Sequence, residues 1–214
     1  MRRLIIDTAT EALSVALFDD GVLMDYHHEI YGRGHAEKLV PVIAEMGGGG
    51  RADEIVVDKG PGSFTGVRVG LAAARALAYG WNAGLRAYES LSLVAAMAAR
   101  RDAETGDRSA TIAVSMTGGH GECFWQIFDR ATLTPLTGVT STPIASLARE
   151  LDAPILYGTG AAVVVEARGH GRAIPLHPDA RCLPLLPDPL LSDDPTPLYG
   201  RGADAMPLAA RENR

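Results

Sequence analysis

The chain has 214 residues, of which 47% are hydrophobic, and its 20 basic and 26 acidic residues give a formal net charge of −6. This length and composition predict a globular protein with one large or two small domains. The acidic balance argues against a stand-alone nucleic-acid-binding protein, for which a basic face is expected. Cys123 and Cys182 are isolated and form no metal-binding or disulfide pattern, which is typical of a reducing compartment. We therefore expect a cytoplasmic protein without a membrane span.

Short apolar runs and turns open the chain. Three runs follow one another closely, at residues 4–6, 14–18 and 22–31. Spacings this short predict an antiparallel meander of three strands. A helix is expected over 35–46, where Pro41 should kink the axis or mark the true start of the helix. The four glycines that follow should end the helix and form a flexible connection.

A glycine-rich motif carries the most information. Residues 60–68 read Gly-Pro-Gly-Ser-Phe-Thr-Gly-Val-Arg, follow an apolar strand expected at 54–58, and open an Ala-rich helix expected over 63–80. Ser63 is a suitable N-cap for this helix. Small residues then recur every four positions and form a stripe along which another helix can approach closely: Gly62, Gly66, Gly70, Ala74 and Ala78.

This stripe predicts a partner interface. We expect Gly62, Gly66, Gly70 and Ala74 to contact a partner protein. The neighbouring helix at 35–46 should add three apolar side chains, those of Leu39, Val42 and Ile43. The same stripe would also fit packing inside the protein's own core, and the sequence does not separate the two interpretations.

The loop can also be interpreted as a phosphate contact, because the start of a helix attracts anions. The loop contains no lysine and so fails the P-loop pattern, while Thr65 occupies the third glycine position of the dinucleotide-binding fingerprint. The residues that would make such a contact are Asp7, Thr8, Gly62 and Ser63.

The order of the expected elements predicts the fold. A short strand near 85–87 and a helix over 90–100 complete the order βββαβαβα, which is that of the ribonuclease H-like unit found in actin-like ATPases. After a polar boundary at 101–109 the pattern resembles a degenerate repeat, with strands at 111–115, 122–128 and 154–157 and a short helix at 146–151. We expect an α/β protein with two tandem domains of mixed sheets flanked by helices. The first domain spans 1–105, and the reduced second domain spans 106–214 and includes a proline-rich extended arm at about 183–198.

Four segments together resemble the bacterial TsaB family. They are Ile6-Asp7-Thr8-Ala9-Thr10, the motif at 60–68, Gly121-Glu122, and Pro197-Leu-Tyr-x-Arg201. The resemblance implies the actin-like (ASKHA) fold and a non-catalytic scaffold in tRNA modification. In that family the complex adds a threonylcarbamoyl group to N6 of adenosine 37, in tRNAs that read codons starting with A.

The resemblance also implies the partners. These are a TsaD-like catalytic paralogue and a TsaE-like ATPase, with a homodimer when the protein is alone and tRNA bound only through the complex. No intrinsic cofactor is implied, although ATP or ADP and magnesium can bind at the level of the complex. The chain departs from the family at Ser115-Met116-Thr117, where Asp-Ala-Arg is usual, at Asp58 and Lys59, which replace more neutral residues, and at 201–207, which lacks a usual proline and lysine.

We considered the side chains that could act in catalysis or bind a metal, and we expect no catalytic residue and no metal ligand among them. His35 lacks a second histidine one turn later, where Leu39 stands. Asp7 ends the first strand, where actin-like ATPases place a magnesium-binding carboxylate, but it can equally bond the amides of the following turn. We therefore expect no activity from the isolated chain. The alternative is a stand-alone metallopeptidase-like hydrolase or an actin-type phosphotransferase, which needs a metal pair or a complete phosphate loop.

Overall fold

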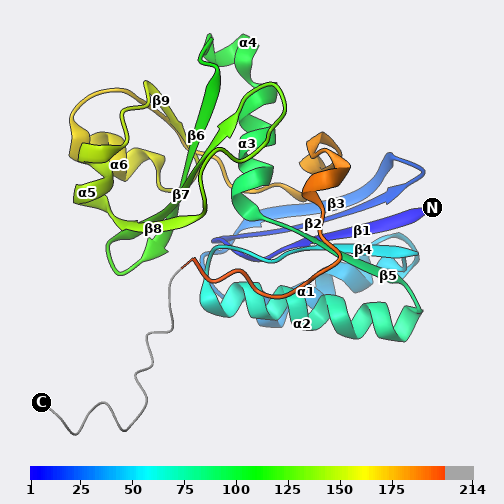
Figure 1. Ribbon diagram of the computed structural model, residues 1–214. Helices are drawn as coiled ribbons and strands as arrows, with labels where there is room; N and C mark the ends of the chain where they lie inside the picture. Colours follow the sequence, from blue (N-terminus) through cyan, green and yellow to red (C-terminus); the bar gives the residue numbers. More distant parts are fainter. Residues whose placement is uncertain (201–214) are drawn as a thin grey trace, which may run out of the picture.

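Two five-stranded mixed sheets form the framework of the protein (Figure 1). The computed structural model describes residues 1–200, except for the side chains of residues 102 and 103. Arg201 of the last family segment and the departures at 201–207 lie outside the described residues. The division of the chain between residues 105 and 106 stays a prediction.

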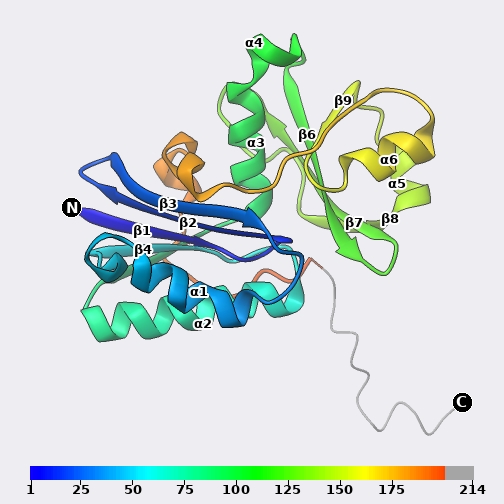
Figure 2. The ribbon, with the colours of Figure 1, turned by 180° about the vertical axis from the view of Figure 1, so that it is seen from behind.

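The first sheet has the strand order β3-β2-β1-β4-β5, in which β1 pairs antiparallel with β2 and parallel with β4. Its strands are β1 (Arg2–Asp7), β2 (Ala12–Asp19), β3 (Val22–Ile30), β4 (Glu54–Asp58) and β5 (Gly84–Tyr88). The helices that follow are α1 (His35–Glu45), α2 (Phe64–Trp81) and α3 (Ser90–Arg100), and the 3-10 turn η1 (Gly47–Gly50) follows α1. Helices α1 and α2 lie side by side on one face of this sheet (Figures 1 and 2).

The second sheet repeats the pattern of the first. Its order is β8-β7-β6-β9-β10, so the first three strands form an antiparallel meander and the last two pair parallel, as in the first sheet. The elements are α4 (Asp102–Thr105), β6 (Thr111–Gly119), β7 (Glu122–Asp129), β8 (Thr140–Pro143), α5 (Ile144–Glu150), β9 (Ile155–Tyr157), α6 (Ala161–Arg168) and β10 (Arg172–Ile174). Strands β9 and β10 have only three residues each. The expected actin-like fold with a reduced second half is confirmed.

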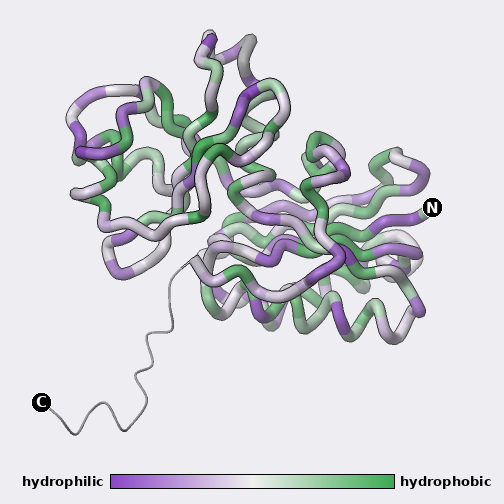
Figure 3. The backbone as a smooth tube through the Cα atoms, in the orientation of Figure 1, coloured by the Kyte–Doolittle hydropathy of each residue, from purple (hydrophilic) through white to green (hydrophobic). Residues whose placement is uncertain are grey.

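Helix α3 lies between the two sheets, and this buried position accounts for its apolar sequence. Eight of its eleven residues are buried, since the helix packs on β6 and β7 and on the turn at Ala180–Leu185, and shares one core with Ile5 of β1 and Val56 of β4. A helix buried all round is expected to be apolar or small at nearly every position, which Leu91, Leu93, Val94 and Ala95 satisfy. Hydrophobic segments accordingly run through the centre of the molecule, while the tip of the β2–β3 hairpin is hydrophilic (Figure 3).

The C-terminal segment returns to the first sheet (Figure 1, orange to red). Residues at its start form two short 3-10 turns, η2 (Ala180–Leu185) and η3 (Asp188–Leu190), so the arm expected at 183–198 is extended only in its later part. Proline supplies the φ angle that such turns need, which is why prolines did not exclude them. Further on, Ser192 exchanges two backbone hydrogen bonds of 2.8 Å with Ala87 of β5.

Helix α1 and the glycines after it can be compared with what the sequence predicted. Helix α1 begins at His35, and Pro41 lies inside it on the exposed side. The glycines after α1 form the turn η1 rather than an irregular connection. Among the helices of residues 1–200, none combines the length and the hydrophobicity needed to cross a membrane.

Candidate functional site

The turn after β1 packs directly on the start of α2. The Ser63 amide donates to the Ala9 carbonyl at 2.7 Å, and the Thr8 hydroxyl donates to the Gly66 carbonyl at 2.7 Å. Ser63 caps the helix as expected, because its hydroxyl accepts from the Gly66 amide at 3.2 Å. The structure therefore brings Thr8, Gly62 and Ser63 together at one end of α2, beside Asp7.

The glycine stripe faces this turn and not a partner. A Cβ atom at Gly66 would overlap the carbonyl oxygen of Thr8, and one at Gly70 would lie 2.5 Å from the Thr8 hydroxyl oxygen. At Gly62 a Cβ atom would overlap the Ala9 carbonyl, and Ala74 is completely buried. The stripe is small because the protein's own β1–β2 turn approaches α2 closely, so the prediction of a partner interface on these residues is wrong.

The sequence also predicted that three apolar residues of α1 contact a partner. Leu39 and Ile43 are buried in the core between α1, α2 and the first sheet, and Val42 packs against that core. Leu39 and Ile43 therefore cannot contact a partner while the protein is folded, whereas Val42 is partly exposed and its place in an interface stays a prediction. Their helical spacing predicted a buried face correctly, but a buried face of this helix covers the chain's own sheet.

The opposite side of α2 is exposed and carries large side chains. Phe64, Arg68 and Tyr79 are exposed there, with exposed fractions of 63% for Phe64 and 93% for Tyr79, and Val40 of α1 is 57% exposed. We call these four residues the helix face. They escaped the sequence analysis, although Phe64, Arg68, Ala72, Arg75 and Tyr79 recur at the spacing of one side of a helix.

The C-terminal family segment lies against the glycine motif. The Leu198 amide donates to the Lys59 carbonyl at 2.8 Å, and Gly60, at φ 96°, leaves no room for a side chain because a Cβ atom would lie 2.9 Å from the Leu198 carbonyl oxygen. The Arg68 guanidinium stacks 3.2 Å from the Phe64 ring centroid and 5.1 Å from that of Tyr199. Two family segments that lie far apart in the sequence thus form one surface beside the helix face.

Beneath the glycine motif lie two buried carboxyl groups, those of Asp7 and Asp58. Asp7 ends β1 and accepts from the Tyr88 hydroxyl at 2.7 Å and from the Ala9 amide at 3.2 Å. Asp58 ends β4 and accepts from the Gly60 amide at 2.6 Å and from the Ser90 hydroxyl at 2.6 and 2.8 Å. The two carboxyl groups also hydrogen-bond to each other. The sequence analysis missed this pair, whose signal was an aspartate at the end of each of two expected strands.

Burial and the neighbouring negative charge set the protonation of this pair. Burial, followed by the charge of Asp7, raises the pKa of Asp58 well above its usual range. Burial also raises the pKa of Asp7, while hydrogen bonds from Asp58 and Tyr88 oppose that rise. Burial and the Asp7 charge raise the pKa of the Tyr88 phenol as well, so Tyr88 stays a hydrogen-bond donor.

This arrangement does not fit a magnesium ion at Asp7. The Asp7 carboxylate has no exposure to solvent and already bonds three groups of the same chain. Within residues 1–200, no three His, Cys, Asp or Glu side chains lie together as metal ligands would. A phosphate contact at the start of α2 stays a prediction, since the amides of Phe64 and Thr65 have no acceptor among the described residues.

Removing the Tyr88 hydroxyl tests the buried pair. Tyr88→Phe should lower the free energy of unfolding by about 1–3 kcal/mol, because a buried carboxylate loses one of its donors while the packed ring remains. Urea unfolding at neutral pH measures this change. Tyr79→Phe, which removes an exposed hydroxyl, is the control and should be silent. Equal stability of Tyr88→Phe and the original protein would contradict the hydrogen bond.

Strand β6 carries the three residues that depart from the family pattern, Ser115, Met116 and Thr117. Ser115 and Met116 of β6 are buried, and the Ser115 carbonyl accepts from the Gly160 amide at 2.9 Å. Thr117 donates its amide to the Thr159 hydroxyl at 3.1 Å. Backbone groups of Ser115 and Thr117 therefore hold β6 against the turn that precedes α6, and a charged pair of side chains at these two positions is not needed for that contact.

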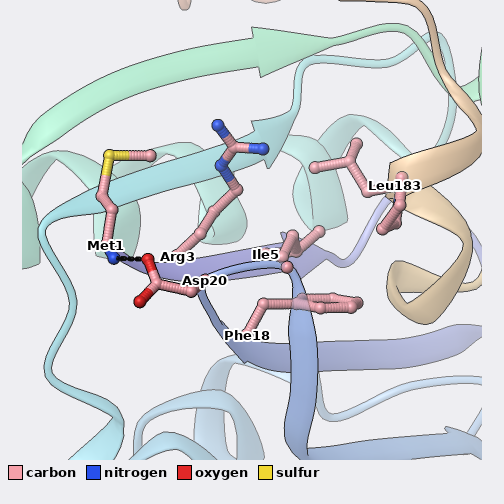
Figure 4. A pocket seen from close by; sticks show the side chains of 8 residues that line it. Met1, Arg3, Ile5, Phe18, Asp20 and Leu183 are labelled. Carbon is pink, nitrogen blue, oxygen red and sulfur yellow. Dashed lines mark hydrogen bonds and ion pairs between the residues drawn. The ribbon is translucent and has the colours of Figure 1, made fainter.

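A pocket of about 310 Å³ lies elsewhere, between the first strands and η2 (Figure 4). Ile5, Phe18 and Leu183 line its apolar part. Its charged groups are engaged, since Arg3 pairs with Glu54 and the N-terminus pairs with Asp20. The pocket contains none of the residues described above at the glycine motif.

The sequence of the chain is similar to known proteins. The model of the TsaD family, tRNA N6-adenosine threonylcarbamoyltransferase, matches residues 25–155. The TsaB protein of Escherichia coli K12, named for tRNA threonylcarbamoyladenosine biosynthesis, is 34% identical over 135 residues, which cover 61% of this chain and 56% of the relative. The chain thus matches only about half the length of this curated relative.

Solved structures extend the likeness to most of the chain. A Pseudomonas aeruginosa protein described as similar to the peptidase YeaZ has a TM-score of 0.69 and 27% identity, covering 86% of this chain and 89% of its own. YeaZ from Pseudomonas aeruginosa has a TM-score of 0.72, 24% identity, and coverage of 92% and 99%, and shows the fold alone. The family model spans more than half of the residues, and the chain belongs to the TsaD family and, within it, to the TsaB proteins.

Proposed function

We propose that the protein is a non-catalytic scaffold and activator in the synthesis of threonylcarbamoyladenosine on tRNA. It binds and positions a TsaD-like catalytic paralogue, and a TsaE-like ATPase completes the complex. The names of its relatives support the pathway. The closed carboxylate site supports the absence of catalysis by this chain, because Asp7 is bonded to Tyr88, Ala9 and Asp58.

The observation that carries the proposal is the helix face. Tyr79, Phe64 and Val40 expose large apolar surfaces on the two helices that cover one face of the first sheet. Aromatic side chains with such exposure are enriched where proteins bind one another. The Arg68 guanidinium, stacked on Phe64, adds a planar donor at the same place.

The same face serves self-association in this proposal. The family model of the catalytic paralogue matches residues 25–155, which include α1 and α2, and we therefore expect the paralogue to present a similar pair of helices. A homodimer formed through the helix face and the complex with the paralogue then exclude each other. Transfer RNA, ATP and magnesium are bound through the complex, and the cellular location that fits these partners is the cytoplasm.

Reconstitution tests the function directly. The isolated protein should neither hydrolyse ATP nor modify tRNA, and it should restore modification when added to the paralogue, the ATPase and threonylcarbamoyladenylate. Mass spectrometry of tRNA nucleosides measures the product. Modification at full rate without this protein, or turnover of ATP by the isolated chain, would contradict the scaffold role and favour the phosphotransferase alternative.

A further inference from the structure

The glycine motif is anchored from below by the two buried carboxyl groups. Asp58 bonds the Gly60 amide, and it bonds the hydroxyl of Ser90, the first residue of α3. The Ser90 amide in turn donates to the Gly60 carbonyl at 3.0 Å. The loop of residues 59–63, here called the glycine loop, is therefore tied to the helix that lies between the two sheets.

The pair has no cation to balance two charges. Among the described residues, neither Asp7 nor Asp58 forms an ion pair with lysine, arginine or histidine. Lys59, the nearest basic residue in sequence, pairs with Glu89 at 3.8 Å instead. Two buried carboxyl groups in hydrogen-bond contact cannot both be ionised without a large cost, so one of them holds a proton.

We infer that Asp7 and Asp58 share a single proton, and that this protonated pair positions the glycine loop and thereby regulates partner binding by pH. Asp58 carries the proton and donates it to Asp7, whose other two donors are Tyr88 and Ala9. The regulatory half of this inference rests on the proposed function, because the helix face begins at the end of the same loop.

The charged and polar groups around Asp7 and Asp58 determine whether the shared proton is lost at higher or at lower pH. Burial raises the pKa of Asp7 most, and the charge of Asp179, just before η2, raises it further, whereas the hydrogen bonds from Tyr88 and Ala9 lower it. Asp179 itself is held ionised by Arg181 at 2.6 Å. Burial and the charge of Asp179 therefore favour keeping a proton on the pair, and a rise in pH removes it.

The sign of the linkage follows from the raised pKa. The folded protein holds a proton that the unfolded chain releases near the usual pKa of aspartate. The contribution of the pair to stability is therefore complete below that usual pKa and is lost as the pH rises through the raised value. Above it, Asp58 no longer donates a hydrogen bond to Asp7, and the two carboxylates repel each other, which displaces Asp58 from the Gly60 amide that donates to it.

Carboxyl carbon NMR of the free chain between pH 5 and 10 tests the shared proton. The Asp58 carboxyl group should stay protonated well above the usual pKa range of aspartate. The hydrogen-exchange protection of the Gly60 amide should fall by up to about tenfold per pH unit above the midpoint. In Asp58→Asn, whose amide stays neutral and can still donate, protection should not depend on pH, whereas Asp152→Asn should behave like the original protein. Ionisation of Asp58 within the usual pKa range of aspartate would overturn the inference.

Binding to the paralogue tests the regulatory half. Affinity should decline with rising pH for the original protein and for Asp152→Asn, and should stay level for Asp58→Asn. Pair protonation that is seen by NMR, with an affinity that does not follow it, would overturn the regulation while leaving the scaffold role intact. Absence of binding at every pH would instead contradict the proposed function, and the NMR measurement would still decide whether the proton is shared.

Discussion

Replacing Gly66 with alanine should destabilise the whole protein, although alanine is the better helix former. The new Cβ atom would overlap the carbonyl oxygen of Thr8, which is backbone and cannot rotate away. Overpacking of this kind costs typically about 1–3 kcal/mol, and a backbone neighbour places this site at the upper end or beyond. Urea unfolding followed by circular dichroism measures the loss.

Gly80→Ala is the matched control. Gly80 lies in the same helix, is exposed, and has nothing near the position of a Cβ atom. Alanine there should stabilise the protein by about 0.5–1 kcal/mol through helix propensity. If Gly66→Ala kept the stability of the original protein but lost its partner, the stripe would be an interface after all, and the packing against the β1–β2 turn would not matter.

The fold could be predicted because its signals are local. The three opening strands are set by their turns, and the long α2 by its N-cap Ser63 and its continuous helical sequence. The second half was harder: strands β6, β7 and β9 were predicted, but β8, α6 and β10 were not. Strands β8 and β10 have only four and three residues, which carry too little periodicity to be separated from a loop.

The site could be predicted only in part, because a small-residue stripe says how close a neighbour comes and not which neighbour it is. The neighbour is the turn at Thr8 and Ala9, more than fifty residues earlier in the chain. The contact of Tyr199 with Phe64 and the pairing of Asp7 with Asp58 are long-range as well. Each depends on how the β-sheet orders its strands, which the sequence of a single motif does not state.

Truncating the helix face should separate partner binding from folding. Tyr79→Ala should weaken binding to the TsaD-like paralogue by about 2 kcal/mol, roughly thirty-fold, if Tyr79 is an anchor of the interface. Its side chain is 93% exposed, so stability should hardly change. Isothermal titration calorimetry gives the affinity, and light scattering of the free protein should show weaker self-association in parallel.

Leu136→Ala provides the comparison that makes this result specific. Leu136 is 55% exposed, but it follows β7 in the second domain, away from α1 and α2. Truncating it removes a similar exposed apolar side chain and should leave both assemblies unchanged. Because Phe64 also holds Arg68 and Tyr199 in place, Phe64→Ala should reduce binding more than its own lost contact explains. Equal affinities of Tyr79→Ala and Leu136→Ala for the paralogue would contradict the helix face as the interface and would indicate that the partner binds another surface.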